Sequence, residues 1–108
     1  MVVRRFDVWL VNLDPAIGKE IKKTRPCLIV SPDEANNYLE TIVGAPMTTN
    51  IRNYPTRIRC VFQRKKGQVA IDQIRSLDKT RLVKKLGVLN EAFCKDVCKT
   101  LLEYFAFE

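Results

Sequence analysis

The chain has 108 residues, of which 46% are hydrophobic and 29% are charged, a composition that is typical of one globular domain and unlike that of a disordered or collagen-like chain. Nineteen Lys and Arg against twelve Asp and Glu give a net charge of +7, which favours a negatively charged partner such as a nucleic acid or an acidic protein. The absence of histidine excludes imidazole chemistry, so carboxylates, Arg, Lys, Cys or Tyr must carry any proton transfer.

We expect a single domain over residues 1–108, because no repeat, linker or low-complexity segment divides them. The longest apolar runs are much shorter than the roughly 20 residues of a membrane-spanning helix. The N-terminus has Arg4-Arg5 without an apolar signal segment behind them. The sequence therefore predicts a cytoplasmic protein without membrane contact.

The first half of the chain predicts two strands, a long loop and a short helix. Asp7–Leu13 is rich in Val and Trp and ends before Asp14-Pro15, and the charged loop 14–24 that follows is long enough to suggest a function. Pro26–Val30 is almost entirely apolar, which predicts a strand buried on both faces. Ser31-Pro32-Asp33-Glu34 has the pattern of a capping box, which predicts a short helix to about residue 37.

Three further strands are expected in the middle of the chain. Thr41–Met47 contains Gly44 and Pro46, which predicts a bulge or a sheet edge. Thr56–Phe62 alternates, with its arginines expected to face outward and its Ile and Val inward. A polar hairpin connection over 63–67 and a returning strand over 68–71 complete this part.

The last third predicts short elements and one helix. Residues 74–77 extend the sheet, Asp78 caps a helical turn over 79–82, and the segment 83–86 ends at Gly87. Asn90 is expected to cap the final helix, which packs on the sheet. Its predicted apolar face consists of Phe93, Cys94, Val97, Cys98, Leu101, Leu102 and Phe105.

Together these elements predict a mainly β, α+β fold: a small, strongly bent antiparallel sheet or partly open barrel with a helix over one side. The four cysteines include no CxxC pair and have no histidine to complete a metal site. We therefore interpret them as reduced and structural, and we expect no metal and no cofactor.

The residues with the strongest chemical signal lie at the ends of the predicted strands. Glu20 and Arg25 fall at the mouth of the second strand; the arginine suits charge stabilisation better than proton abstraction. Thr48-Thr49 follow the third strand, where their hydroxyls are placed to cap the strand-to-loop turn. Asp72, after the strand 68–71, is a second available carboxylate.

An ordered series of motifs covers nearly the whole chain: DVWLVNLDP, G-x-E, TRPCLIVSP, NN, APMTT, YPTRI and DQIRSLDKTRL leading to LG. In this series the chain resembles the MazF/PemK toxins of bacterial toxin-antitoxin systems, although it has Phe6 where that family usually has glycine. The resemblance implies a homodimeric, SH3-like barrel similar to CcdB and PemK. It also implies metal-independent, sequence-specific cleavage of single-stranded RNA by attack of the 2′-hydroxyl, and inhibition by an acidic antitoxin.

The resemblance assigns roles to the candidate residues. It implies that Arg25 stabilises the phosphorane and that Thr48 supports the phosphate, with Thr49 as the alternative, while Glu20, Asp72 and Arg25 itself stay open as the proton acceptor. Gln73 either reads a base edge or bonds a neighbouring turn. The residues expected to bind RNA are Lys19, Lys22, Lys23, Thr49, Asn50, Gln73, Arg75 and Arg81.

Two alternative functions use the same fold. A CcdB-like gyrase poison would bind a protein and cleave nothing, but it acts through a C-terminal tryptophan, and the only tryptophan here is Trp9. A non-catalytic RNA-binding barrel would retain RNA without forming products.

Overall fold

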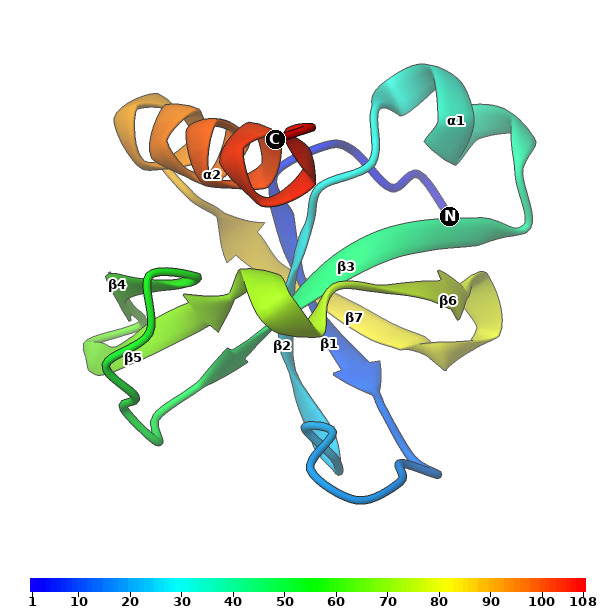
Figure 1. Cartoon of the computed structure of the whole chain (residues 1–108). Helices are drawn as coiled ribbons and strands as arrows, with labels where there is room; N and C mark the ends of the chain where they lie inside the picture. Colours follow the sequence, from blue (N-terminus) through cyan, green and yellow to red (C-terminus); the bar gives the residue numbers. More distant parts are fainter.

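The computed structural model describes residues 1–108, and its strands form one strongly curled antiparallel half-barrel (Figure 1). The strand order is β4-β5-β3-β2-β1-β7, and β6 also pairs with β3. None of the helices has the length and apolar character needed to cross a membrane. The predicted bent sheet with a terminal helix is confirmed. The elements are β1 (Asp7–Asn12), β2 (Thr24–Ile29), α1 (Asp33–Tyr38), β3 (Thr41–Thr48), β4 (Arg57–Phe62), β5 (Lys65–Ala70), the 3-10 turn η1 (Ile71–Gln73), β6 (Arg75–Asp78), the 3-10 turn η2 (Lys79–Arg81), β7 (Leu82–Val88) and α2 (Glu91–Phe105).

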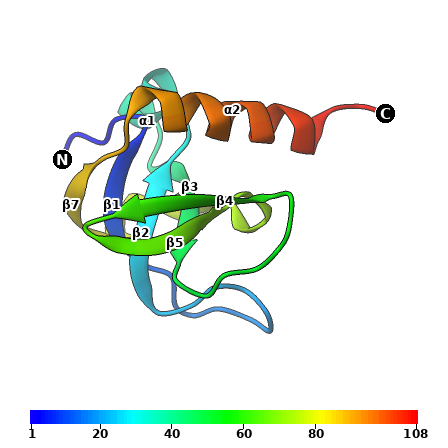
Figure 2. The same cartoon turned by 90° about the vertical axis from the view of Figure 1, so that its left-hand side faces the viewer.

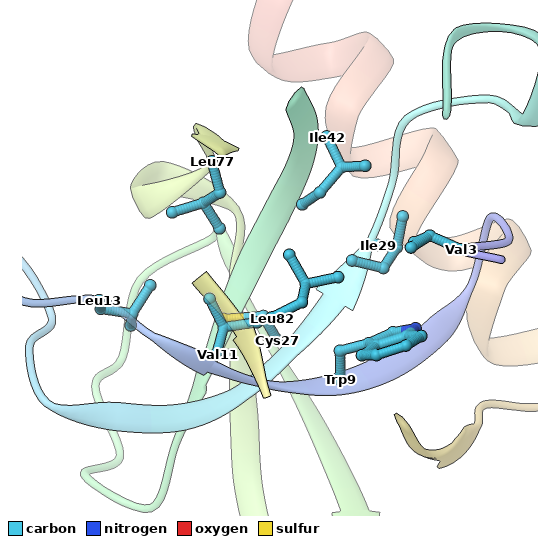
Figure 3. Close-up of a cluster of buried hydrophobic side chains, with 9 residues drawn as sticks. All are labelled: Val3, Trp9, Val11, Leu13, Cys27, Ile29, Ile42, Leu77 and Leu82. Carbon is cyan, nitrogen blue, oxygen red and sulfur yellow. The ribbon is translucent and has the colours of Figure 1, made fainter. Parts of the chain in front are cut away.

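The core lies on both faces of the central strands, because successive side chains of a strand point to opposite sides. On one face Trp9, Cys27 and Ile29 belong to a cluster inside the curl (Figure 3). On the other face Val8 and Leu28 belong to a second cluster that includes Val97 of α2. The prediction that the second strand is buried on both faces is therefore confirmed for Cys27–Ile29.

The expected bulge or edge in the third strand is wrong, because β3 is a central strand. It pairs with β2 on one side, and its other side pairs first with β6, up to Gly44, and then with β5, from Met47 onward. Pro46 lies in the interval between these two partners, where its missing N–H breaks no ladder bond on that side. The change of partner delivers Thr48 to the β5 side of the sheet.

The β4–β5 hairpin differs from the prediction in two ways. Its connection is only Gln63-Arg64, both at positive φ (50° and 65°), so Lys65 already belongs to β5. Val61 lies on the same side of β4 as Arg59 and is 64% exposed, so the prediction that it faces inward is wrong; Ile58 and Phe62 pack inward instead.

Two predicted chain signals act differently in the structure. Ser31 does not cap α1: its hydroxyl donates to Asn36 Oδ1 at 2.6 Å and accepts from the amide of Val43, so it ties the loop to β3. Gly87 does not end the last strand, because it lies inside β7 opposite Val8. The Phe62 ring passes 3.4 Å from where a side chain of Gly87 would begin.

The terminal helix begins as predicted and packs over only part of its length. Asn90 accepts a hydrogen bond from the amide of Phe93 at 2.8 Å, which confirms the cap. Cys94 and Val97 are buried, whereas Leu102 is 75% and Phe105 67% exposed. Figure 2 shows the last turns of α2 and the C-terminus lying beyond the sheet.

Candidate active site

A pocket of about 260 Å³ lies between the start of β2, the end of β3 and the β4–β5 hairpin. Antiparallel pairing places Cys27 opposite Pro46, and continuing that register by two residues brings Arg25 level with Thr48. The predicted residues Arg25, Thr48 and Thr49 are therefore brought together. The pocket is lined by Thr24, Arg25, Pro26, Met47, Thr48, Thr49, Cys60, Phe62, Gln63, Lys65, Lys66, Gly67 and Gln68.

Arg25 presents an unpaired cationic group to this pocket. Its Nε donates to the carbonyl oxygen of Lys22 at 2.8 Å, and it forms no ion pair. Both terminal nitrogens thus lack a protein acceptor, so the guanidinium is aimed by one bond and keeps its other donors for a ligand. Planar donors of this kind match two oxygens of a phosphate.

Thr48 is the most enclosed polar group of the predicted set, with 8% of its surface exposed. Its Oγ1 accepts from the amide of Asn50 at 3.1 Å and donates to no protein acceptor. The hydroxyl proton is therefore free to be donated to a ligand. Thr49 and Asn50 are exposed beside it.

The pocket is positively charged. Arg25, Lys65 and Lys66 line it together with no carboxylate. Lys65 and Lys66 are exposed on β5 and are absent from the sequence-based candidates. Both lysines fall in the segment 63–67 that was predicted as the hairpin connection, because a tight hairpin turn normally shows Gly, Asn or Asp and Gln63-Arg64 gives no such signal.

Glu20 lies outside the pocket, in the exposed loop between β1 and β2. Its Oε1 accepts from the amide of Ile17 at 2.8 Å, a bond within the loop. The loop approaches the pocket through Lys22, whose carbonyl holds Arg25. Lys19, Lys22 and Lys23 are exposed along it.

Asp72 also lies outside the pocket, in η1, where it pairs with Arg57. The Arg57 Nε and Nη2 atoms donate to its two carboxylate oxygens at 2.7 and 3.0 Å, and the Thr56 hydroxyl donates at 2.9 Å. The hydrogen bonds from Arg57, assisted by Thr56, hold the pKa of the Asp72 carboxyl below its usual range. Its oxygens are engaged in fastening the chain before β4 to η1.

Three of the residues predicted to bind RNA form hydrogen bonds with the backbone of the β1–β2 loop or its ends. Gln73 accepts from the amide of Ile21 at 3.1 Å. Arg75 donates to the Leu13 carbonyl, and Arg81 donates to the carbonyls of Asn12 and Asp14. In this geometry they fix the base of the loop and do not line the pocket, so their RNA contact stays a prediction.

Cys27 and Cys94 are buried, whereas Cys60 and Cys98 are partly exposed and Cys60 lines the pocket. Cys27 is fully buried, and burial raises the pKa of its thiol to about 12, which keeps the thiol protonated and unreactive. All four cysteines are free. No group of three cysteine or acidic side chains has the arrangement of a metal site.

Comparisons with known proteins agree with this fold. The family model described as "PemK-like, MazF-like toxin of type II toxin-antitoxin system" matches residues 4–105. An endoribonuclease MazF from Staphylococcus epidermidis is 34% identical over 97 residues, which cover 84% of this chain and 81% of that protein. Among solved structures, MazF from Deinococcus radiodurans superposes with a TM-score of 0.88 at 24% identity over 99% of both chains. A mycobacterial endoribonuclease in complex with its cognate antitoxin gives 0.81 at 24% identity over 98% of this chain and 99% of its own.

Proposed function

This chain belongs to the PemK-like, MazF-like toxins of type II toxin-antitoxin systems and is an endoribonuclease, and on this premise we propose that it cuts single-stranded RNA at short sequence motifs without a metal ion. The observation that carries the proposal is the pocket in which the free guanidinium nitrogens of Arg25 lie beside the Thr48 hydroxyl and two lysines. These groups supply positive charge and donors where the negative charge of a phosphorane develops. Family membership favours this activity over a gyrase poison or an inactive barrel.

The proposed reaction is attack of the ribose 2′-hydroxyl on the adjacent phosphorus: the 2′-oxygen–phosphorus bond forms, the bond from phosphorus to the 5′-oxygen breaks, and the leaving 5′-oxygen takes a proton from solvent water to become the 5′-hydroxyl. Arg25 stabilises the equatorial oxygens, and Thr48 donates its hydroxyl to the same phosphate. Lys65 and Lys66 hold neighbouring phosphates. Each group is a donor, so a separate proton acceptor is needed.

We propose Glu20 as the proton acceptor, an assignment that requires the β1–β2 loop to move toward the pocket when RNA binds, because Glu20 does not line the pocket. The pairing of Asp72 with Arg57 argues against Asp72, and a guanidinium that stays protonated is a poor base. The Glu20 carboxylate is exposed and lies two residues from Lys22, whose carbonyl aims Arg25. The loop thus links the acceptor to the charge stabiliser.

The exposed surface suggests two protein partners. The basic pocket suits an acidic antitoxin that blocks RNA, as the mycobacterial relative is described with its cognate antitoxin. The second partner is another copy of this chain: Leu102 and Phe105 on α2 are largely exposed, Leu102 lines a hollow of about 500 Å³ and both line a second hollow of about 450 Å³, and a homodimer would bury them. The proposed RNA substrate and antitoxin partner support a cytoplasmic location.

Cleavage of a defined RNA by the purified protein in EDTA tests the proposal. We expect products with 2′,3′-cyclic phosphate and 5′-hydroxyl ends, no cleavage of the all-deoxy strand, and loss of activity in Arg25→Ala. Sequencing the 5′-hydroxyl ends would give the motif. Cleavage of the deoxy strand, or a need for added Mg²⁺, would contradict the mechanism.

A further inference from the structure

Gln68 is a buried polar residue in β5 and is 2% exposed. Both polar atoms of its side chain form hydrogen bonds to one exposed loop, the segment between β3 and β4. Its Oε1 accepts from the Arg52 amide at 3.0 Å and its Nε2 donates to the Arg52 carbonyl at 2.8 Å. The carboxamide therefore pairs with both backbone groups of Arg52, as a neighbouring strand would.

This pairing bears directly on the pocket. Gln68 lies opposite Thr48 in the β3–β5 ladder and lines the same pocket. Arg52 is two residues beyond Asn50, whose amide donates to Thr48 Oγ1. Fixing residue 52 thus restricts the amide that orients the Thr48 hydroxyl.

The close packing of β5 against the end of β3 is a second observation that links Gln68 to the geometry of the pocket. A Cβ atom at Gly67 would meet the Thr48 carbonyl oxygen at 2.7 Å, so glycine allows β5 to approach the end of β3 this closely. The Gln68 side chain reaches the loop from this position.

We propose that Gln68 is a positioning residue for RNA cleavage: through the backbone of Arg52 it holds residues 50–52 so that the Asn50 amide fixes the Thr48 hydroxyl as a donor to the phosphate. The inference rests on the proposed function of the pocket. Gln68 acts through Thr48, and it removes the need for RNA to order this segment on binding.

The test compares Gln68→Met, which removes both hydrogen bonds at similar volume and without new charge, with Asn36→Leu. Asn36 is also a 2% exposed amide with two hydrogen bonds, both to Ser31, but it lies in α1. Rates are measured in single turnover with enzyme in excess, so that slow variants remain measurable, and thermal unfolding is followed in parallel. Gln68→Glu, which keeps only the acceptor, serves if Gln68→Met does not fold.

We expect Gln68→Met to lower the saturating cleavage rate about tenfold, with the half-saturating concentration changed less than about threefold. Asn36→Leu should lose comparable thermal stability at an unchanged rate. In a Thr48→Val background, Gln68→Met should have almost no further effect, because both changes act on one hydroxyl.

Three results would overturn the inference: a folded Gln68→Met at the wild-type rate, an equal slowing in Asn36→Leu, or an undiminished effect of Gln68→Met in the Thr48→Val background. A wild-type rate in Thr48→Val would instead refute the role of Thr48 in the proposed function, and the inference with it. If Thr48→Val is slow and Gln68→Met is not, only the inference fails.

Discussion

Arg57 and Asp72 form a two-bond ion pair that joins the start of β4 to the turn after β5, with nitrogen–oxygen distances of 2.7 and 3.0 Å. The guanidinium also lies over the ring of Tyr54, 5.2 Å from its centre. The segment between β3 and β4 starts directly after Thr48, the last residue of β3, and the ion pair holds its other end in place. A carboxylate engaged in this way has a structural role.

Asp72→Asn should lower stability and leave the chemistry largely intact. The change leaves a mostly buried arginine without its counter-charge, which costs about 1–3 kcal/mol of unfolding free energy. The saturating cleavage rate should fall by less than about tenfold, since general-base catalysis alone contributes about 100-fold or more. Urea unfolding and single-turnover kinetics measure both. A stable Asp72→Asn protein with its rate reduced beyond 100-fold would restore Asp72 as the base.

The same pair predicts a pH dependence of stability. The pKa of Asp72 is lower in the folded protein than in the unfolded chain. The contribution of Asp72 to the free energy of unfolding is therefore fully present above the unfolded pKa of about 4. It is lost as the pH falls through the folded pKa, because protonation then breaks the pair. The stability difference between wild type and Asp72→Asn should be flat from about pH 7 to pH 5 and shrink below about pH 4. A difference that grows in acid would contradict this.

Lys65 and Lys66 should contribute to RNA affinity through phosphate contacts. Each Ala substitution should raise the half-saturating RNA concentration and reduce the slope of log affinity against log salt by about 0.7, the value for one single-strand phosphate contact. Lys84→Ala is the matched control, because Lys84 is exposed on β7 and does not line the pocket. A salt slope unchanged in Lys65→Ala and Lys66→Ala, or changed equally in Lys84→Ala, would remove these lysines from the binding surface.

Gly67→Ala should damage the pocket by steric contact alone. The added Cβ meets the Thr48 carbonyl oxygen at 2.7 Å, and a backbone atom cannot rotate away, so β5 must move from β3 at a cost of about 1–3 kcal/mol. The cleavage rate should fall with the stability. Gly18→Ala is the comparison: Gly18 has open space around it but a positive φ of 59°, so its effect reports strain outside the pocket. Wild-type activity in Gly67→Ala would show that this approach is not needed.

Sequence patterns predicted the strands well because alternation and apolar runs are local signals. Arg25 and Thr48 were expected at strand ends, and the β2–β3 register brings them together. The hairpin was misjudged because two non-glycine residues, Gln63 and Arg64, take positive φ there, which no propensity indicates. Because the turn has only these two residues, β5 starts at Lys65, and its pairing with β4 and β3 places Lys65, Lys66 and Gln68 in the pocket.

Side-chain pairing was the other limit of sequence reasoning. Asp72 pairs with an arginine fifteen positions away, and Gln68 binds a backbone sixteen positions away. Such partners depend on how β4 and β5 fold back on each other, and they leave no periodic pattern in the chain. Asp72 was therefore predicted as a candidate base, whereas the structure shows it paired with Arg57.

Glu20→Gln should separate the proton acceptor from the charge stabiliser. If Glu20 takes the 2′-proton, Glu20→Gln should lower the saturating cleavage rate about 100-fold or more, because the amide cannot accept that proton. Arg25→Lys keeps the charge but loses the planar fork, so it should slow cleavage, though less than Arg25→Ala does. Because the Glu20 side chain bonds only the Ile17 amide in its own loop, thermal stability should change little, which makes the rate a direct report on chemistry. A folded Glu20→Gln protein that cleaves at close to the wild-type rate would assign the proton to another group.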